Sequence, residues 1–156
     1  MSHAFSPAQR SLDVDLRNAV RADADDVAAL LTELGYPCEI DDAAERISSI
    51  LANDRQALVV ARRYGVVCGL VALDFMYYLP LGTTTCRVTA LVVSNTAQGQ
   101  GIGRHLLKEA ERRARAGGAS RIELTSGAQR VEAHAFYIAC GYGSQSVRFV
   151  KQLGSA

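Results

Sequence analysis

Residues 91–104 read LVVSNTAQGQGIGR, and this stretch says most about the fold. Three apolar, strand-forming residues lead into a polar turn with glycines at positions 99, 101 and 103. From Ile102 onward, apolar residues recur at helical spacing until Gly117 and Gly118. The stretch therefore predicts a buried strand, a glycine-rich turn and a long amphipathic helix. The start of such a helix exposes unpaired backbone N–H groups at the positive end of its dipole, an arrangement that binds anions, most often phosphate.

The rest of the chain predicts strands and helices on both sides of this stretch. Before it, the spacing of apolar residues predicts a strand beginning at residue 14, helices over 23–34 and 42–51, and strands over 57–62, 66–75 and 84–93. After it, the pattern predicts a strand over 122–126, a short helix over 131–140 and a closing strand over 147–153. This order predicts a mixed α/β sheet covered by helices, in a single domain over residues 12–156 that follows a loose leader at residues 1–11.

Local signals mark the ends of several predicted elements. Asp42 and Glu45 have the spacing of a capping box, which indicates a helix start at Asp42. Tyr64 and Gly65 separate two β-branched runs, which predicts a hairpin turn. Gly141 is expected to end the helix over 131–140.

Composition and charge favour a globular protein with a small ligand. The 156 residues are 49% hydrophobic and 21% charged, and the net charge is only +1, so nucleic acid and membrane surfaces are not expected as partners. No apolar run reaches the roughly 20 residues of a membrane span, and the first residues lack a signal-peptide core, so we expect a cytoplasmic protein. The scattered cysteines indicate neither a zinc site nor a disulfide framework and are expected to be reduced: Cys38, Cys68, Cys86 and Cys140.

The glycine turn does not match the two common nucleotide-binding loops. No Gly-Lys-Ser/Thr follows, as the Walker pattern requires, and no glycine stands three residues after Gly103 to complete a dinucleotide fingerprint. A nucleotide-binding module is therefore an alternative that the missing lysine argues against. The turn indicates another phosphate-bearing ligand.

The turn resembles the pyrophosphate loop of the GCN5-related N-acetyltransferases, which has the form Gln/Arg-x-x-Gly-x-Gly/Ala. Gln98, Gly101 and Gly103 match that form. The resemblance is close from about residue 84 to the end and includes AHAFYIACGY, whereas before residue 84 it rests on the order of elements. It implies a central, mostly antiparallel sheet in which the strands containing residues 91–93 and 122–126 are parallel and splay apart.

The resemblance also implies a set of site residues. Acetyl-coenzyme A would be the cosubstrate, and a primary amine would attack it directly in a ternary complex. Tyr137 matches the family tyrosine that is proposed to protonate the departing thiolate. The residues implied to bind the coenzyme are Leu91, Val92 and Val93 at the pantetheine arm, and Gln98, Gly99, Gln100, Gly101, Ile102, Gly103 and Arg104 at the pyrophosphate.

One position departs from the family pattern. Many members carry a glutamate in the strand before Leu-x-Val, where this chain has Thr89 and Ala90. The proton of the ammonium could instead leave through water bound by Thr89, or to Asp74 or Glu39. His134 and the arginines at 112, 113 and 115 are interpreted as helix-surface residues.

The sequence indicates the chemical class of the acceptor but not its identity. The segments ELTSG, AHAFY and RFVK resemble acetyltransferases of amino acids, aminophosphonates or aminoglycosides, so a small-molecule amine is expected, bound near residues 36–39 and 74–78. The alternatives are a protein or peptide N-acetyltransferase and a non-catalytic acyl-coenzyme A sensor, the latter suggested by the missing glutamate. No metal is implied, and the resemblance admits a homodimer without indicating its interface.

Overall fold

The computed structural model describes residues 13–125 and 131–154. The leader expected at residues 1–11, and Ser126 at the end of a predicted strand, lie outside the described residues. The chain forms two compact units, residues 1–123 and 124–156. None of the described helices is both long enough and apolar enough to cross a lipid bilayer.

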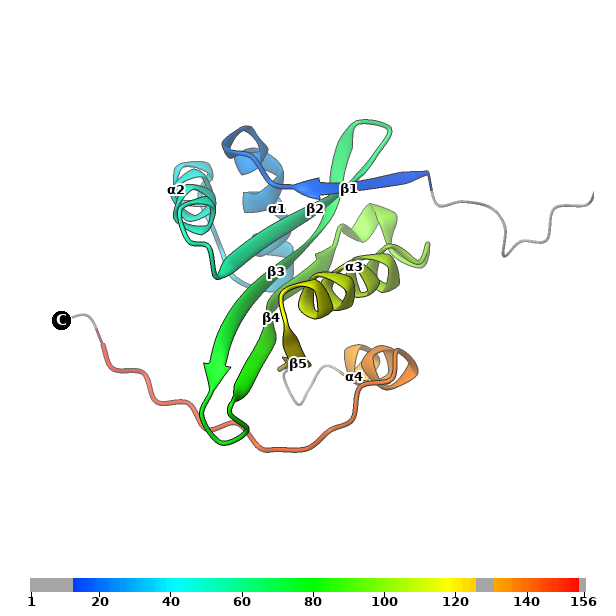
Figure 1. Cartoon of the computed structure of the whole chain (residues 1–156). Coiled ribbons are helices and arrows are strands. Elements are labelled where there is room, and N and C mark those ends of the chain that lie inside the picture. Colours follow the sequence, from blue (N-terminus) through cyan, green and yellow to red (C-terminus); the bar gives the residue numbers. More distant parts are fainter. Residues whose placement is uncertain (1–12, 126–130, 155–156) are drawn as a thin grey trace, which may run out of the picture. The chain divides into compact units, whose positions relative to one another are not determined.

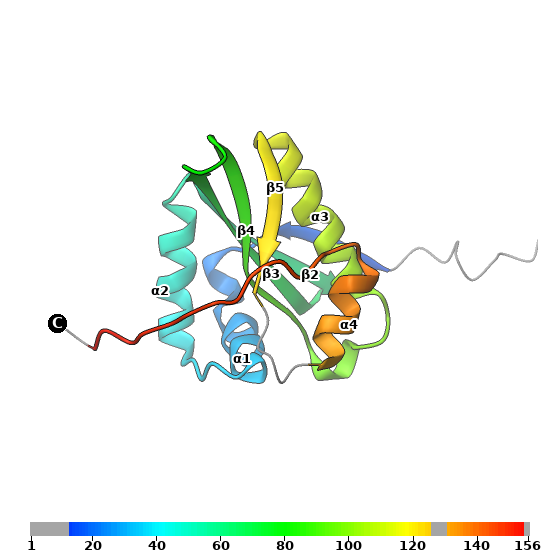
Figure 2. The ribbon, with the colours of Figure 1, turned by 90° about the horizontal axis from the view of Figure 1, so that it is seen from below.

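The first unit contains a five-stranded sheet in the order β1-β2-β3-β4-β5. Strands β1 to β4 pair antiparallel in chain order, and β5 lies beside β4 (Figure 2). Side-chain contacts join residues 83, 85 and 87 of β4 to residues 120, 121 and 123 of β5, so the two strands run parallel. This confirms the expected mixed sheet. The strands are β1 (Val14–Asn18), β2 (Gln56–Arg63), β3 (Val66–Tyr78), β4 (Thr83–Val93) and β5 (Ala119–Leu124).

Helices cover both faces of the sheet (Figure 1). α1 (Ala24–Leu34) and α2 (Ile40–Leu51) pack on one face, where they form a buried cluster with Val60, Leu70 and Val92. α3 (Ile102–Ala116) packs on the other face. There Gly69 of β3 lets the helix approach, because a Cβ at this position would lie 3.2 Å from Cδ1 of Leu106. Burial of these apolar faces stabilises the fold at about 25 cal/mol per Å² of apolar surface.

The hairpin and the long helix agree with the sequence prediction. Tyr64 and Gly65 join β2 to β3 with φ angles of 52° and 77°, which are the positive values that a type I′ turn needs at both central residues. α3 begins directly after the glycine turn and ends before Gly117, as predicted.

The predicted start of α2 is wrong by two residues. The helix begins at Ile40 after Glu39, so Asp42 and Glu45 both lie inside it and form no capping box. Asp41 and Asp42 stand in the first turn, where a negative charge interacts favourably with the helix dipole whichever residue precedes the helix. Leu51, the last residue of α2, is 54% exposed.

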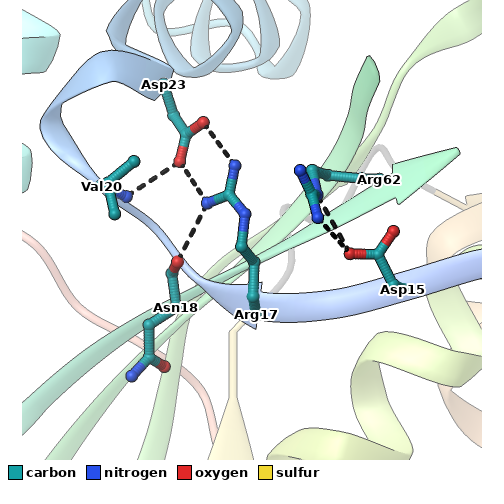
Figure 3. A network of polar contacts seen from close by, with 6 residues as sticks. All are labelled: Asp15, Arg17, Asn18, Val20, Asp23 and Arg62. Carbon is teal, nitrogen blue, oxygen red and sulfur yellow. Dashed lines mark hydrogen bonds and ion pairs between the residues drawn. The ribbon is translucent and has the colours of Figure 1, made fainter. Parts of the chain in front are cut away.

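Two arginine–carboxylate pairs join β1 to its neighbours (Figure 3). Arg17 donates hydrogen bonds of 2.7 and 2.9 Å to the two oxygens of Asp23, which also accepts one of 2.9 Å from the backbone N–H of Val20. These contacts tie the end of β1 to the turn before α1. The second pair, Arg62 with Asp15, is more exposed and links β2 to β1 at 2.8 Å.

The second unit contains α4 (Val131–Ala139) followed by a segment without regular structure. Gly141, with φ of 93°, follows the helix as predicted. The closing strand predicted over residues 147–153 is wrong, because residues 142–154 form neither helix nor strand. Val147 and Phe149 are 78% and 91% exposed. Alternating apolar residues form a strand only where a neighbouring strand satisfies their backbone groups, and this segment is in no ladder of the described chain.

Candidate active site

The candidate site begins at an irregularity in β4. In the β3–β4 ladder, Ala72 pairs with Ala90 and Leu73 pairs with Val88, so Thr89 is an extra residue that has no partner in β3. Such a bulge bends a strand and redirects its backbone groups, and bulges recur beside active sites. Thr89 is exposed, and its hydroxyl makes only a long hydrogen bond of 3.4 Å to the carbonyl oxygen of Ala72.

The strand beyond the bulge leads to the glycine turn. Val92 is buried in the core under α1 and α2, whereas Leu91 and Val93 are half-buried. After β4 the chain forms a short 3₁₀ turn, Asn95–Ala97, which the sequence analysis did not predict. The side-chain amide of Gln98 then donates hydrogen bonds of 3.3 Å to the carbonyl oxygen of Val93 and 3.2 Å to Oδ1 of Asn95. Gln98 therefore holds the turn against the end of β4.

The turn opens the N-terminus of α3 to a ligand. Gly101 precedes the helix with φ of 81°, a left-handed backbone conformation that glycine adopts without strain. The first hydrogen bond of the helix runs from the N–H of His105 to the carbonyl oxygen of Gly101. The N–H groups of Ile102, Gly103 and Arg104 come before that bond and have no partner inside the helix. They provide donors at the positive end of a 15-residue helix, which fits a pyrophosphate.

Arg104 adds a positive charge to this helix end. Its side chain is exposed, and within the described residues its guanidinium has no hydrogen-bond or ion-pair partner. Two of the other three arginines of α3 differ in this respect. Arg112 and Arg113 both bind Glu109, and these hydrogen bonds lower the pKa of Glu109 to about 2. They act within the helix, as the sequence interpretation of a helix surface expected.

Tyr137 lies in the second unit, in the last turn of α4. It is half-buried, and its ring lies 5.4 Å from that of Phe136 and 6.3 Å from that of Tyr142, measured between centroids. The carbonyl oxygen of Tyr137 accepts a hydrogen bond from the N–H of Tyr142 beyond the helix end. This arrangement fixes the ring relative to the turn at Gly141.

The carboxylates suggested as bases stand on different elements. Asp74 of β3 pairs with Arg87 in the ladder, next to the positions that flank the bulge at Thr89. Glu39 precedes α2 and is exposed. The structure therefore brings Asp74, and not Glu39, to the strand pair that contains the bulge.

The cysteines do not provide a nucleophile on the first unit's sheet. Cys86 is completely buried in β4, and burial raises the pKa of its thiol to about 11. Burial also raises the pKa of the Cys68 thiol. Because the thiolate is the reactive form, both groups are unreactive near neutral pH. Within residues 13–125 and 131–154, no group of three or more His, Cys, Asp or Glu side chains is arranged to hold a metal ion.

A charged cluster that joins the middle of β4 to β5 could not be predicted from the sequence. Arg87, Arg121 and Glu123 lie together there, beside Thr85 and Tyr78. The only sequence signal is that charged residues interrupt two apolar strands, and nothing in the sequence shows that the strands are neighbours.

The bulged strand and the open helix end form a site that suits a phosphate-bearing ligand, and the comparisons identify the family of the chain. The sequence profile of the Acetyltransferase (GNAT) family matches residues 24–142. The chain therefore belongs to this family, as its loop suggested. It is an acetyltransferase, and acetyl-coenzyme A is its cosubstrate.

Individual relatives extend this result. The chain is 36% identical over 141 residues to the aminoalkylphosphonate N-acetyltransferase of Salmonella typhimurium strain LT2. The aligned region covers 89% of this chain and 91% of that protein. Two solved structures share the fold. A GNAT family acetyltransferase of Staphylococcus aureus superposes with a TM-score of 0.78 at 23% identity, and the match covers 91% of this chain and 100% of that chain. An aminoglycoside N-acetyltransferase in complex with CoA superposes with a TM-score of 0.79 at 17% identity, and the match covers 90% of this chain and 95% of that chain.

Proposed function

We propose that this acetyltransferase acetylates the primary amine of a small molecule, and that the acceptor is an aminoalkylphosphonate. The observation that carries the acceptor class is the 36% identity to a protein of that activity over 91% of that protein's length. The likeness to structures of other acetyltransferases concerns the fold alone. The acetyl group passes directly from the thioester to the amine, in keeping with the buried, protonated thiol of Cys86.

The end of β4 and the glycine turn bind the coenzyme in this proposal. Acetyl-coenzyme A supplies the acetyl group as a thioester. Backbone groups of Leu91, Val92 and Val93 pair with the pantetheine arm as an added strand would, and an N–H near the bulge donates to the thioester carbonyl oxygen. The turn holds the pyrophosphate through the segment from Gln98 to Arg104, where the free helix N–H groups and the Arg104 guanidinium donate hydrogen bonds.

Two proton transfers accompany the reaction. The acceptor ammonium loses its proton to water bound by Thr89, or to Asp74 across the ladder from the start of the bulge. Tyr137 protonates the coenzyme thiolate as it leaves. The reference pKa of a phenol, near 10, and that of a thiol, near 8.5, are close enough for proton transfer as the negative charge develops on the sulfur. Holding both substrates in one complex replaces a bimolecular encounter with a fixed geometry, which accelerates the reaction.

A thiol-release assay tests the acceptor class. We expect acetyl-coenzyme A consumption to depend on aminomethyl- and 2-aminoethylphosphonate, with kcat/KM values above those for amino acids, polyamines, aminoglycosides and peptide amino termini. Mass spectrometry of the acceptor would identify the N-acetyl product. A higher kcat/KM for peptides would replace the small-molecule assignment with a protein acetyltransferase. Coenzyme binding without turnover of any amine would favour the sensor alternative.

A pair of glycine variants tests the coenzyme site. Gly101 and Gly118 precede and follow α3 with nearly equal φ angles of 81° and 79°. Gly101→Glu and Gly118→Glu therefore carry the same backbone strain, about 1–2 kcal/mol. Only Gly101→Glu places a negative charge at the proposed pyrophosphate site. We expect it to weaken coenzyme binding in calorimetry more than about tenfold, with Gly118→Glu unchanged; equal affinities would refute the site.

A further inference from the structure

The charged cluster formed by Arg87 of β4 with Arg121 and Glu123 of β5 lies on one face of the sheet. Arg87 stands directly opposite Asp74 in the β3–β4 ladder, and facing residues of a ladder share a face. Arg121 and Glu123 are two residues apart on β5 and therefore share a face as well. Contacts from Arg121 to Thr85 and from Glu123 to Arg87 join the two strands.

Arg121 is held in a fixed position. Its Nε donates a hydrogen bond of 3.0 Å to the hydroxyl of Thr85, which is fully buried. Its Nη2 donates another of 3.0 Å to Glu123, and its guanidinium lies 4.2 Å from the centre of the Tyr78 ring. These three contacts orient the group, while its side chain is still 34% exposed. Within the described residues the N–H groups of Nη1 have no partner, so they remain available to a ligand.

Arg87 is held less firmly than Arg121. Its Nε lies 3.9 Å from Oε1 of Glu123, which is too long for a hydrogen bond. Its side chain is 37% exposed, and none of the described residues accepts a hydrogen bond from it. The carboxylate of Glu123 thus lies near the guanidinium groups of both Arg87 and Arg121, but it accepts a hydrogen bond only from Arg121. The second guanidinium is available for an oxyanion.

The cluster is within reach of the bulge. Arg87 precedes Thr89 by two residues, which is about 7 Å along a strand. If the amine reacts beside the bulge, an anionic group one or two carbons away from it falls near the Arg87 side chain. Asp74, opposite Arg87, faces the same region, and its carboxylate can accept a hydrogen bond from the ammonium group of the acceptor. The arrangement matches a zwitterion with an amine at one end and an oxyanion at the other.

We propose that Arg87 and Arg121 bind the phosphonate group of the acceptor and thereby determine acceptor specificity. This inference rests on the proposed function, since it locates the acceptor relative to the bulge. Arg121 supplies a preoriented guanidinium fork, and Arg87 turns from Glu123 to the ligand. A phosphonate has three oxygens and can accept hydrogen bonds from both guanidinium groups at once. A carboxylate has only two oxygens and so offers fewer acceptor positions to the same two groups.

Arg87→Gln is the test variant, and Arg62→Gln is its matched control. Arg62 is also a half-exposed strand arginine paired with a carboxylate, and its side chain is 35% exposed, but it pairs with Asp15 on β1. Arg121→Lys is a second test variant that keeps the charge and removes the planar fork. Thermal unfolding confirms that each variant is folded. Steady-state kinetics with 2-aminoethylphosphonate then give KM and kcat separately.

Arg87→Gln is expected to raise KM for 2-aminoethylphosphonate about 10- to 100-fold, the factor for losing a hydrogen bond between charged groups, with a smaller effect on kcat. Arg121→Lys should raise it as well, and Arg62→Gln should not. Methylphosphonate, which has no amine, should inhibit the wild type in competition with the acceptor and inhibit Arg87→Gln much less. A wild-type preference for β-alanine over 2-aminoethylphosphonate would overturn the phosphonate assignment.

Two results separate this inference from the proposed function. If the wild type acetylates 2-aminoethylphosphonate while Arg87→Gln and Arg121→Lys keep its KM and its inhibition by methylphosphonate, the proposed function stands and the arginine site is wrong. If the wild type acetylates no aminoalkylphosphonate, the proposed acceptor is wrong and the arginine site falls with it.

Discussion

Replacement of Asp23 by asparagine should destabilise the fold far more than the same change at Asp15 (Figure 3). Asp23 has 8% of its side chain exposed and accepts three hydrogen bonds, two of them from Arg17. Breaking a buried ion pair costs about 3–5 kcal/mol. Because the Arg17 side chain is 30% exposed, water compensates part of this loss, and we expect Asp23→Asn to lower the free energy of unfolding by about 2–3 kcal/mol.

Asp15 is the control for this prediction, since it also pairs with a strand arginine. Its side chain is 58% exposed and that of Arg62 is 35% exposed. Exposed pairs contribute about 0–1 kcal/mol, so Asp15→Asn should change the free energy of unfolding by about 0.5 kcal/mol or less. Urea unfolding of both variants at pH 7, followed by circular dichroism, measures the two values. Equal losses would refute the reasoning from burial.

The stabilisation that Asp23 provides should depend on pH. The hydrogen bonds from Arg17 hold the pKa of Asp23 below its usual 3.8 in the folded state. Its contribution to stability is therefore complete above the pKa of the unfolded chain and is lost as pH falls through the lower, folded pKa. The difference in unfolding free energy between wild type and Asp23→Asn should be constant above about pH 5 and should shrink below about pH 4. A difference that stays constant to pH 2 would contradict this origin.

Three further predictions concern the reaction and the thiols. Tyr137→Phe should lower the single-turnover rate of acetyl transfer by about 10²–10⁴ while coenzyme affinity is kept, and an unchanged rate across the pH range would assign the proton to another donor. Thr89→Val should slow transfer only modestly, because its hydroxyl is unactivated and its 3.4 Å hydrogen bond to Ala72 is weak; a loss beyond about a thousandfold would place Thr89 in the proton path. Cys86, with a pKa of about 11, should resist iodoacetamide at pH 8 in the folded protein, as peptide mass spectrometry can show, and rapid modification would contradict its burial.

The elements with local signals could be predicted from the sequence. The hairpin at Tyr64 and Gly65 and the helix from Ile102 each follow from short-range patterns, because turn chemistry and helical spacing involve neighbouring residues. The start of α2 could not be predicted, since the acidic residues that open it stabilise any of several starting positions. The strand predicted over residues 147–153 failed because strand formation needs a partner that alternation does not identify.

Only the part of the candidate site that is formed by consecutive residues could be predicted from the sequence. Residues 98–104 form one turn, and their open N–H groups follow from a glycine turn before a helix. The bulge at Thr89 depends on the register with β3, and register is set by packing across the sheet. The contact of Arg121 with Thr85 joins residues 36 positions apart, on parallel strands connected by α3. No local pattern reports such a pair.

The order of features along β4 explains how one strand can contact both substrates in the proposed reaction. Its first half carries Arg87 toward β5, its middle holds the unpaired Thr89, and its end leads to the glycine turn. Without the extra residue, every side chain before the bulge would point to the opposite face, because successive strand residues alternate. Arg87 would then face the core under α3, where Cys86 and Val88 are now buried. The bulge therefore allows the charged residues proposed to bind the acceptor and the apolar end of β4 to lie in one strand without placing a charge in the hydrophobic core.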